Sequence, residues 1–132
     1  MTVMTGKSAL QLKVLPYELT VCQAASLEDI RLSSDFFFIG RTDEELSLVC
    51  RTEDVPDHTQ SREDGWRAFR VEGVLEFSLT GILSRLSGAL AENGIPVFAV
   101  STYNTDYILV KGENLDRAVS ALTRDGCEVL PE

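Results

Sequence analysis

The chain has 132 residues, of which 44% are hydrophobic and 25% are charged, a balance that is typical of a folded globular domain and argues against disorder or a coiled coil. Twenty-one acidic against twelve basic residues give a formal net charge of −9. This charge argues against nucleic acid or an anionic membrane as the main partner, because both require basic patches.

The sequence shows no clear targeting signal and no cysteine pattern typical of redox or metal chemistry. No run approaches the roughly 18 apolar residues of a membrane helix, and the first residues lack the apolar core of a signal peptide. The three cysteines lie far apart and form no C-x-x-C pair, so we expect buried thiols in a reducing compartment. The expected location is the cytoplasm.

The first half of the chain predicts short strands. They are expected at residues 10–14, 18–23, 36–41 and 46–51, with a helical turn at 26–30 and a polar turn at 42–45. Residues 52–65 are acidic and almost without apolar side chains, so we interpret them as an exposed linker. The predicted domains are therefore a degenerate unit at residues 1–65, which includes this linker, and a complete unit at 66–132.

The second half has a clearer pattern. Alternating residues predict a strand from Trp66 to Gly73, and an apolar stripe predicts a helix that ends near Gly94. Strands follow at 97–102 and 106–111, joined by a three-residue turn, then a helix closed by Gly126 and a short strand at 127–130. The order strand, helix, strand, strand, helix, strand predicts an α+β, ferredoxin-like (βαββαβ) fold, an antiparallel sheet with both helices on one face.

The two halves share a pattern of strand, polar turn and strand. When residues 37–54 are placed over 98–115, at a constant offset of 61, Phe37 meets Phe98 and Leu48 meets Leu109. The pattern favours two related units in tandem, although any two hairpins with apolar strands would look alike.

Two stretches resemble a known family. Residues 80–98, with a loop glycine, a helix and the strand entry Gly94-Ile95-Pro96-Val97, resemble an ACT domain. Residues 101–110 are similar to the S-T-(Y/F)-x-x-D-(F/Y)-I-L-V stretch of the CASTOR-type cytosolic arginine sensors, and related ACT domains regulate aspartate kinases. The resemblance implies a regulatory protein with two ACT-like units, which binds an amino acid, needs no cofactor or metal and catalyses no reaction.

The resemblance also implies the ligand site. It maps to the loop and first helical residues Thr80, Gly81, Ile82 and Leu83, and to the turn residues Ser101, Thr102, Tyr103, Asn104 and Asp106. Gly81 would let backbone N–H groups approach a carboxylate at a helix N-terminus. Asp106 would pair with an ammonium or guanidinium group, and Tyr103 would offer a ring face.

Simpler roles fit the same residues: Asp106 in a polar turn, Gly81 at a helix start and Tyr103 as an edge aromatic. The alternative function is a structural dimerisation or interaction module that has lost its ligand pocket. An enzyme would need an acid–base pair, for which the sequence offers no candidate, and the single histidine, His58, excludes a multi-histidine metal site. The expected partners are a small-molecule ligand, a second copy of the chain and a regulated enzyme or protein.

Overall fold

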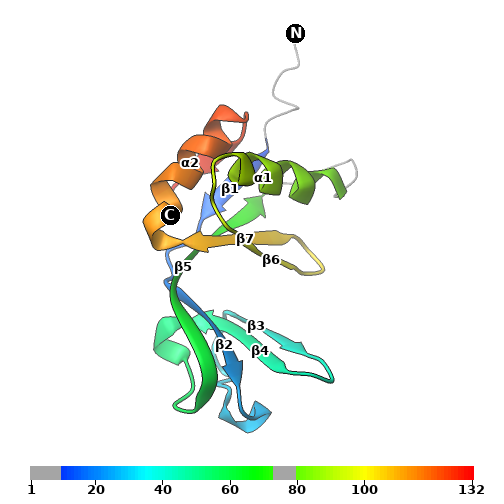
Figure 1. The fold of residues 1–132 in the computed structure, drawn as a ribbon, viewed down its shortest axis with the longest axis vertical. Coiled ribbons are helices and arrows are strands. Elements are labelled where there is room, and N and C mark those ends of the chain that lie inside the picture. The colour runs from blue at the N-terminus through cyan, green and yellow to red at the C-terminus, as the bar shows by residue number, and fades with distance from the viewer. Residues whose placement is uncertain (1–9, 73–79) are drawn as a thin grey trace. The chain divides into compact units, whose positions relative to one another are not determined.

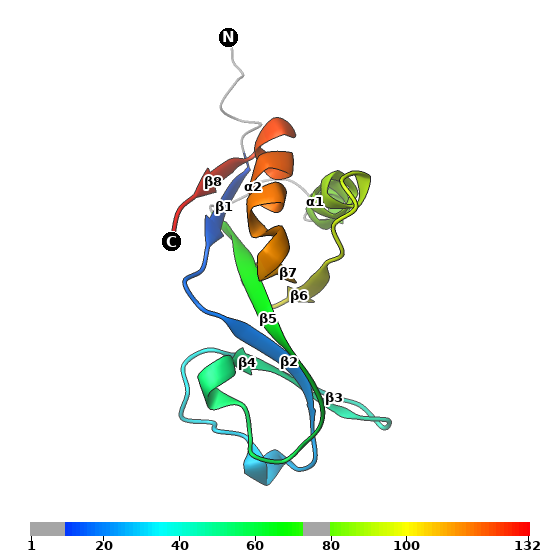
Figure 2. The same ribbon diagram turned by 60° about the vertical axis from the view of Figure 1, so that its left-hand side comes forward.

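The computed structural model describes residues 10–72 and 80–132, apart from the side chain of Thr80. The chain divides into two compact units, and the boundary differs from the predicted one. The helix-bearing unit contains residues 10–16 and Arg67–Glu132, and the small unit contains Tyr17–Trp66. Figure 1 labels most elements of both units, and Figure 2 also labels the last strand.

The helix-bearing unit contains the predicted order of elements and one additional strand. Its elements are β1 (Gln11–Val14), the end of β5 (Thr59–Glu72), α1 (Thr80–Glu92), β6 (Phe98–Ser101), β7 (Asp106–Lys111), a 3-10 turn (Gly112–Asn114), α2 (Leu115–Arg124) and β8 (Glu128–Leu130). Both predicted helices and the predicted hairpin are confirmed. The fold class is α+β with a mostly antiparallel sheet, as expected.

The additional strand, β1, lies between β5 and β8, so the strand order of this unit is β6-β7-β5-β1-β8. Leu12 pairs with Val71 of the antiparallel β5 and with Val129 of the parallel β8. The predicted domain of residues 66–132 is therefore wrong as a self-contained unit, and the sheet is not wholly antiparallel. Strand pairing across more than a hundred residues leaves no local pattern in the sequence, which is why the prediction missed it.

One face of this sheet carries the core. Alternate residues of three strands contribute apolar side chains, because successive side chains of a strand point to opposite faces. The core residues are Leu12, Val14, Phe69, Val71, Ile108 and Val110 from the strands, and Ile82, Leu86, Leu90, Ala118, Ala121 and Leu122 from the helices. Figure 2 shows α1 and α2 on the same side of the sheet, as predicted.

Glycines end both helices. Gly94 follows α1 with a φ of 70°, and Gly126 follows α2 with a φ of 98°. The N–H of Ile95 donates to the carbonyl of Leu90, and the N–H of Cys127 donates to the carbonyl of Leu122, each at 3.0 Å. This six-to-one bond across a left-handed glycine satisfies a helix-end carbonyl and turns the chain back toward the sheet.

The small unit consists of strands and two 3-10 turns in its described part, in keeping with a reduced unit. It contains β2 (Leu19–Ala24), a turn (Leu27–Asp29), β3 (Phe37–Arg41), β4 (Leu46–Arg51), a turn (Thr52–Asp54) and the first part of β5. The strand order is β3-β4-β2-β5, all antiparallel. Its core contains Cys22, Ala24, Ile30, Leu46, Leu48 and Cys50.

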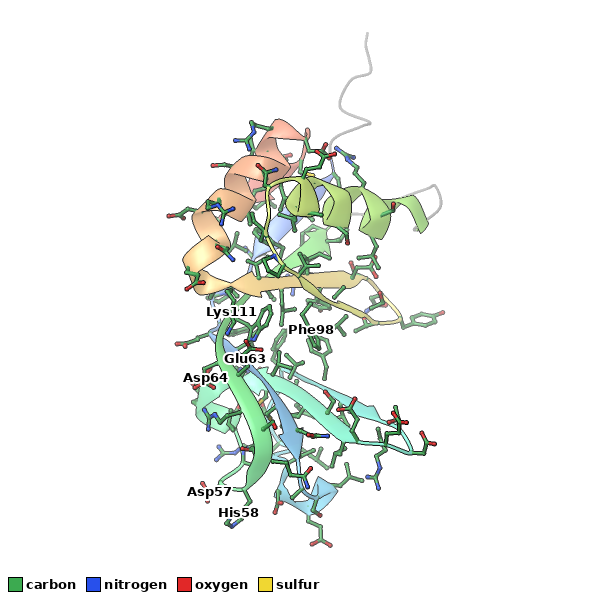
Figure 3. The ribbon with its side chains drawn as sticks, viewed as in Figure 1. Asp57, His58, Glu63, Asp64, Phe98 and Lys111 are labelled. Carbon is green, nitrogen blue, oxygen red and sulfur yellow. The ribbon has the colours of Figure 1, made fainter. Side chains whose placement is uncertain are left out.

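Residues 52–65 are not a linker, which corrects the prediction. Thr52–Asp54 forms a 3-10 turn, and Val21 of β2 pairs with Glu63 of β5. This part of β5 is an edge strand with exposed side chains, so backbone hydrogen bonds hold it without apolar residues. Its register shifts next to Gly65, whose φ of 86° favours glycine. Figure 3 shows His58 on the exposed loop that leads into β5.

The two hairpins match at an offset of 60, not the predicted 61. In the small unit Arg41 pairs with Leu46, and in the helix-bearing unit Ser101 pairs with Asp106. Buried and half-buried residues also follow one another in the same order along the six positions of β4 and of β7. The sequence comparison aligned Phe37 with Phe98 by residue type, whereas the turn sets the register.

All three cysteines are free and buried, as expected. Burial raises the pKa of Cys50 to about 12 and raises the pKa values of Cys22 and Cys127 above the ordinary value. Because the thiolate is the reactive form, the folded protein keeps these thiols protonated.

We predict that replacing Leu12 by Ala lowers the free energy of unfolding by about 2–5 kcal/mol, because its fully buried side chain lies at the centre of the core. Urea denaturation measures the change. The control is Gln11→Ala, an exposed neighbour on the same strand, which should cost at most about 1 kcal/mol. Equal losses for the two variants would contradict the central position of β1.

We also predict that a thiol reagent at pH 8 labels the native protein far more slowly than the urea-unfolded protein. The raised pKa values and the burial both lower the accessible thiolate. Absorbance of the released chromophore measures the rate. Labelling of a cysteine at the unfolded rate in the native state would show that this residue is not buried.

Candidate ligand site

Side-chain hydrogen bonds fix the turn of the β6–β7 hairpin. The Thr102 N–H donates to the carbonyl of Thr105 at 2.8 Å, and the Thr102 hydroxyl donates to the same carbonyl at 3.1 Å. The Thr105 hydroxyl donates to the carbonyl of Val71 on β5 at 2.7 Å. The turn is thus held to the central part of the sheet.

The predicted turn residues divide into two groups. Ser101, Thr102, Tyr103 and Asn104 are exposed, and Tyr103 is exposed along its whole side chain (103%). Asp106 opens β7 and is only 8% exposed. Within the described residues its carboxylate forms no hydrogen bond or ion pair. A cationic group of a ligand at this position would form a charge-assisted hydrogen bond with the carboxylate.

The predicted residues at the start of α1 also include one that is exposed and two whose side chains pack in or against the core. Gly81 is exposed, and a Cβ built on it meets no atom within 4 Å. The side chain of Ile82 lies in the core and that of Leu83 packs against the core, so these residues offer a ligand only their backbone. Figure 1 shows the start of α1 and the tip of the β6–β7 hairpin at the same end of this unit.

The small unit repeats the turn chemistry. The Thr42 N–H donates to the carbonyl of Glu45 at 3.0 Å, and the Thr42 hydroxyl accepts from the Glu45 N–H at 3.2 Å. Beside this turn lies a hollow of about 640 Å³, lined by residues of β2, the loop after it, the turn itself and β5. The sequence predicts only a solvated turn here, although at the predicted offset of 61 residues 43–45 correspond to residues 104–106.

We also searched residues 10–72 and 80–132 for a metal site and for a helix that could cross a membrane. No three His, Cys, Asp or Glu side chains in this part of the chain gather closely enough to hold a metal ion. None of its helices has the length and apolar character needed to cross a membrane.

Comparison with known proteins decides the family. The family model of the ACT domain matches residues 61–124, which contain every residue of the predicted site, and a second family model, of an N-terminal domain, matches residues 20–58. Residues 61–124 therefore contain an ACT domain. The resemblance seen in the sequence is therefore confirmed, and the family supports a ligand-binding regulatory role.

Individual ACT relatives agree with this assignment. The cytosolic arginine sensor for mTORC1 subunit 1 of Homo sapiens is 28% identical over 109 residues, which make up 77% of this chain and 33% of the sensor. The chain thus spans about a third of that relative's length.

Two solved structures share the fold. An X-ray structure of an Agobacterium tumefaciens protein is 31% identical, with a TM-score of 0.84 over 94% of both chains. The aspartate kinase of Clostridium acetobutylicum, an allosteric enzyme, is 13% identical with a TM-score of 0.62, over 87% of this chain and 34% of the kinase.

We predict that Thr105→Val lowers the free energy of unfolding by about 1 kcal/mol, because it removes the half-buried hydrogen bond to Val71 without changing the shape of the side chain. Thermal or urea denaturation measures the loss. Thr123→Val on the exposed surface of α2 is the matched control. If the two variants lose the same amount, the bond to Val71 does not hold the turn.

Proposed function

We propose that this chain is a regulatory ACT protein that binds an amino acid between the start of α1 and the β6–β7 turn, with no catalytic activity of its own. Asp106 would pair with a cationic group of the ligand. The exposed N–H of Gly81 would receive the ligand carboxylate at the positive end of α1.

The observation that carries this proposal is the position of Asp106, an acidic residue beside the predicted turn that is only 8% exposed. It has no described partner, although six arginines elsewhere in the described chain pair with carboxylates. A turn residue with only a structural role would be expected to face water or to accept a hydrogen bond from its own turn. The similarity to an arginine sensor favours a cationic amino acid.

The proposed regulation acts through another protein. The predicted turn residues are mostly exposed, so a second copy of the chain could complete the pocket in a homodimer, and a bound ligand would then change what the dimer contacts. We place this protein in the cytoplasm, as the name of the human relative indicates for that protein.

A structural interaction module is the second candidate function. It is favoured by Tyr103, which is fully exposed on a turn that is fixed by hydrogen bonds. An exposed aromatic side chain of this kind is suited to an interface with a partner protein.

We predict that a panel of amino acids at millimolar concentration contains at least one member that raises the melting temperature, because a ligand that binds only the folded state stabilises it. Arginine belongs in the panel. A flat response to all twenty amino acids would favour the interaction module.

We predict that Gly81→Ala abolishes this ligand response while the protein stays folded. The added methyl group meets no protein atom within 4 Å, yet it fills the space that the ligand carboxylate would need. Gly88→Ala, also in α1 and also in open space, is the matched control, since both changes raise helix propensity. A retained response in Gly81→Ala would place the ligand elsewhere.

A further inference from the structure

One side of α2 presents an unusual pair of arginines. Arg117 and Arg124 are seven residues apart, with Ser120 between them, so all three side chains lie along one face of the helix. Together with Asn93 and Asp116 they line a hollow of about 380 Å³ on the surface of the helix-bearing unit. None of these residues belongs to the proposed amino-acid site.

Both guanidinium groups are held in place by neutral acceptors. Arg117 donates to the backbone carbonyl of Asn93 at 2.6 Å and to the side-chain oxygen of Asn114 at 2.9 Å. Arg124 donates to the side-chain oxygen of Asn93 at 3.0 Å. Asn93 is itself fixed, because its amide donates to the carbonyl of Ala89 at 2.8 Å. Since a guanidinium has five N–H donors, each arginine keeps donors to spare.

Neither arginine of this pair forms an ion pair with another described residue. Six other arginines in the described chain form ion pairs: Arg31, Arg51, Arg62, Arg67, Arg70 and Arg85. Arg117 and Arg124 have no carboxylate within ion-pair distance among the described residues, although the whole chain carries 21 acidic residues. Two neighbouring cations held side by side repel each other, and a bound anion would offset that repulsion.

We propose that the hollow on α2, between Arg117 and Arg124, binds a phosphate group. Phosphate offers several oxygens to two guanidinium forks and to the Ser120 hydroxyl, and paired arginines are well suited to it. Asp116 at the rim repels any anion, so binding requires that the two arginines attract the phosphate more strongly than this single carboxylate repels it. The phosphate is either free or carried by a small metabolite.

The structural alternative is that the arginines only cap α1, since cations near a helix C-terminus are stabilising. In that case replacing either arginine would lower the free energy of unfolding, but phosphate would not bind to the unaltered protein. Phosphate binding to the unaltered chain therefore separates the two explanations.

The test is an NMR titration of the whole chain with inorganic phosphate, at constant ionic strength maintained with chloride. The amide of Ser120 and the side-chain Nε–H signals of Arg117 and Arg124 should shift and saturate at millimolar phosphate. Arg124→Gln should weaken the affinity about tenfold, the loss expected for one charge-assisted hydrogen bond. Ser120→Ala should weaken it less and leave the capping bonds to Asn93 in place.

Arg41→Gln is the control for charge, because Arg41 is exposed, lies in the small unit and has no described ion pair. It should leave phosphate binding unchanged. A phosphate monoester that binds more tightly than inorganic phosphate would identify a carried phosphate, and equal binding would identify free phosphate. Absence of saturable shifts at these three residues, or an equal loss in Arg41→Gln, would overturn the proposal.

Discussion

The pairing of β1 with both β5 and β8 is the interaction on which the helix-bearing unit depends. β1 supplies Leu12 to the centre of the core and joins β5, from the middle of the sequence, to β8, from its end. In the described part of the chain β8 pairs with β1, so we expect the last strand to depend on the first for its place in the sheet. The sheet in turn supports α1 and the β6–β7 hairpin, the two elements that carry the proposed ligand residues.

The features that the sequence predicts well are local ones. The helix that ends at Gly94, the helix that ends at Gly126 and the hairpin turn all rest on contacts between residues a few positions apart. Side-chain periodicity and glycine positions record such contacts directly. The sequence resemblance to the ACT domain family covers the same region and is confirmed by the comparison.

The features that the sequence does not predict depend on residues far apart in the chain or on polar residues. The insertion of β1 depends on partners more than fifty residues away. Residues 59–65 form a strand although they are polar, because an edge strand can be held by its backbone alone. The burial of Asp106 is also invisible in the sequence, where a carboxylate beside a turn predicts exposure. The sequence also does not predict that Arg117 and Arg124 of α2 both donate hydrogen bonds to Asn93, which follows α1.

An amino acid bound between Gly81 and the turn that precedes Asp106 would be located most directly by an NMR titration. The isotope-labelled chain is titrated with the amino acid that gives the largest thermal response. We expect saturable shifts of the amide signals of Gly81, Ile82 and residues 102–106, with little change in the small unit. Saturable shifts that map only to other residues would contradict this location of the site.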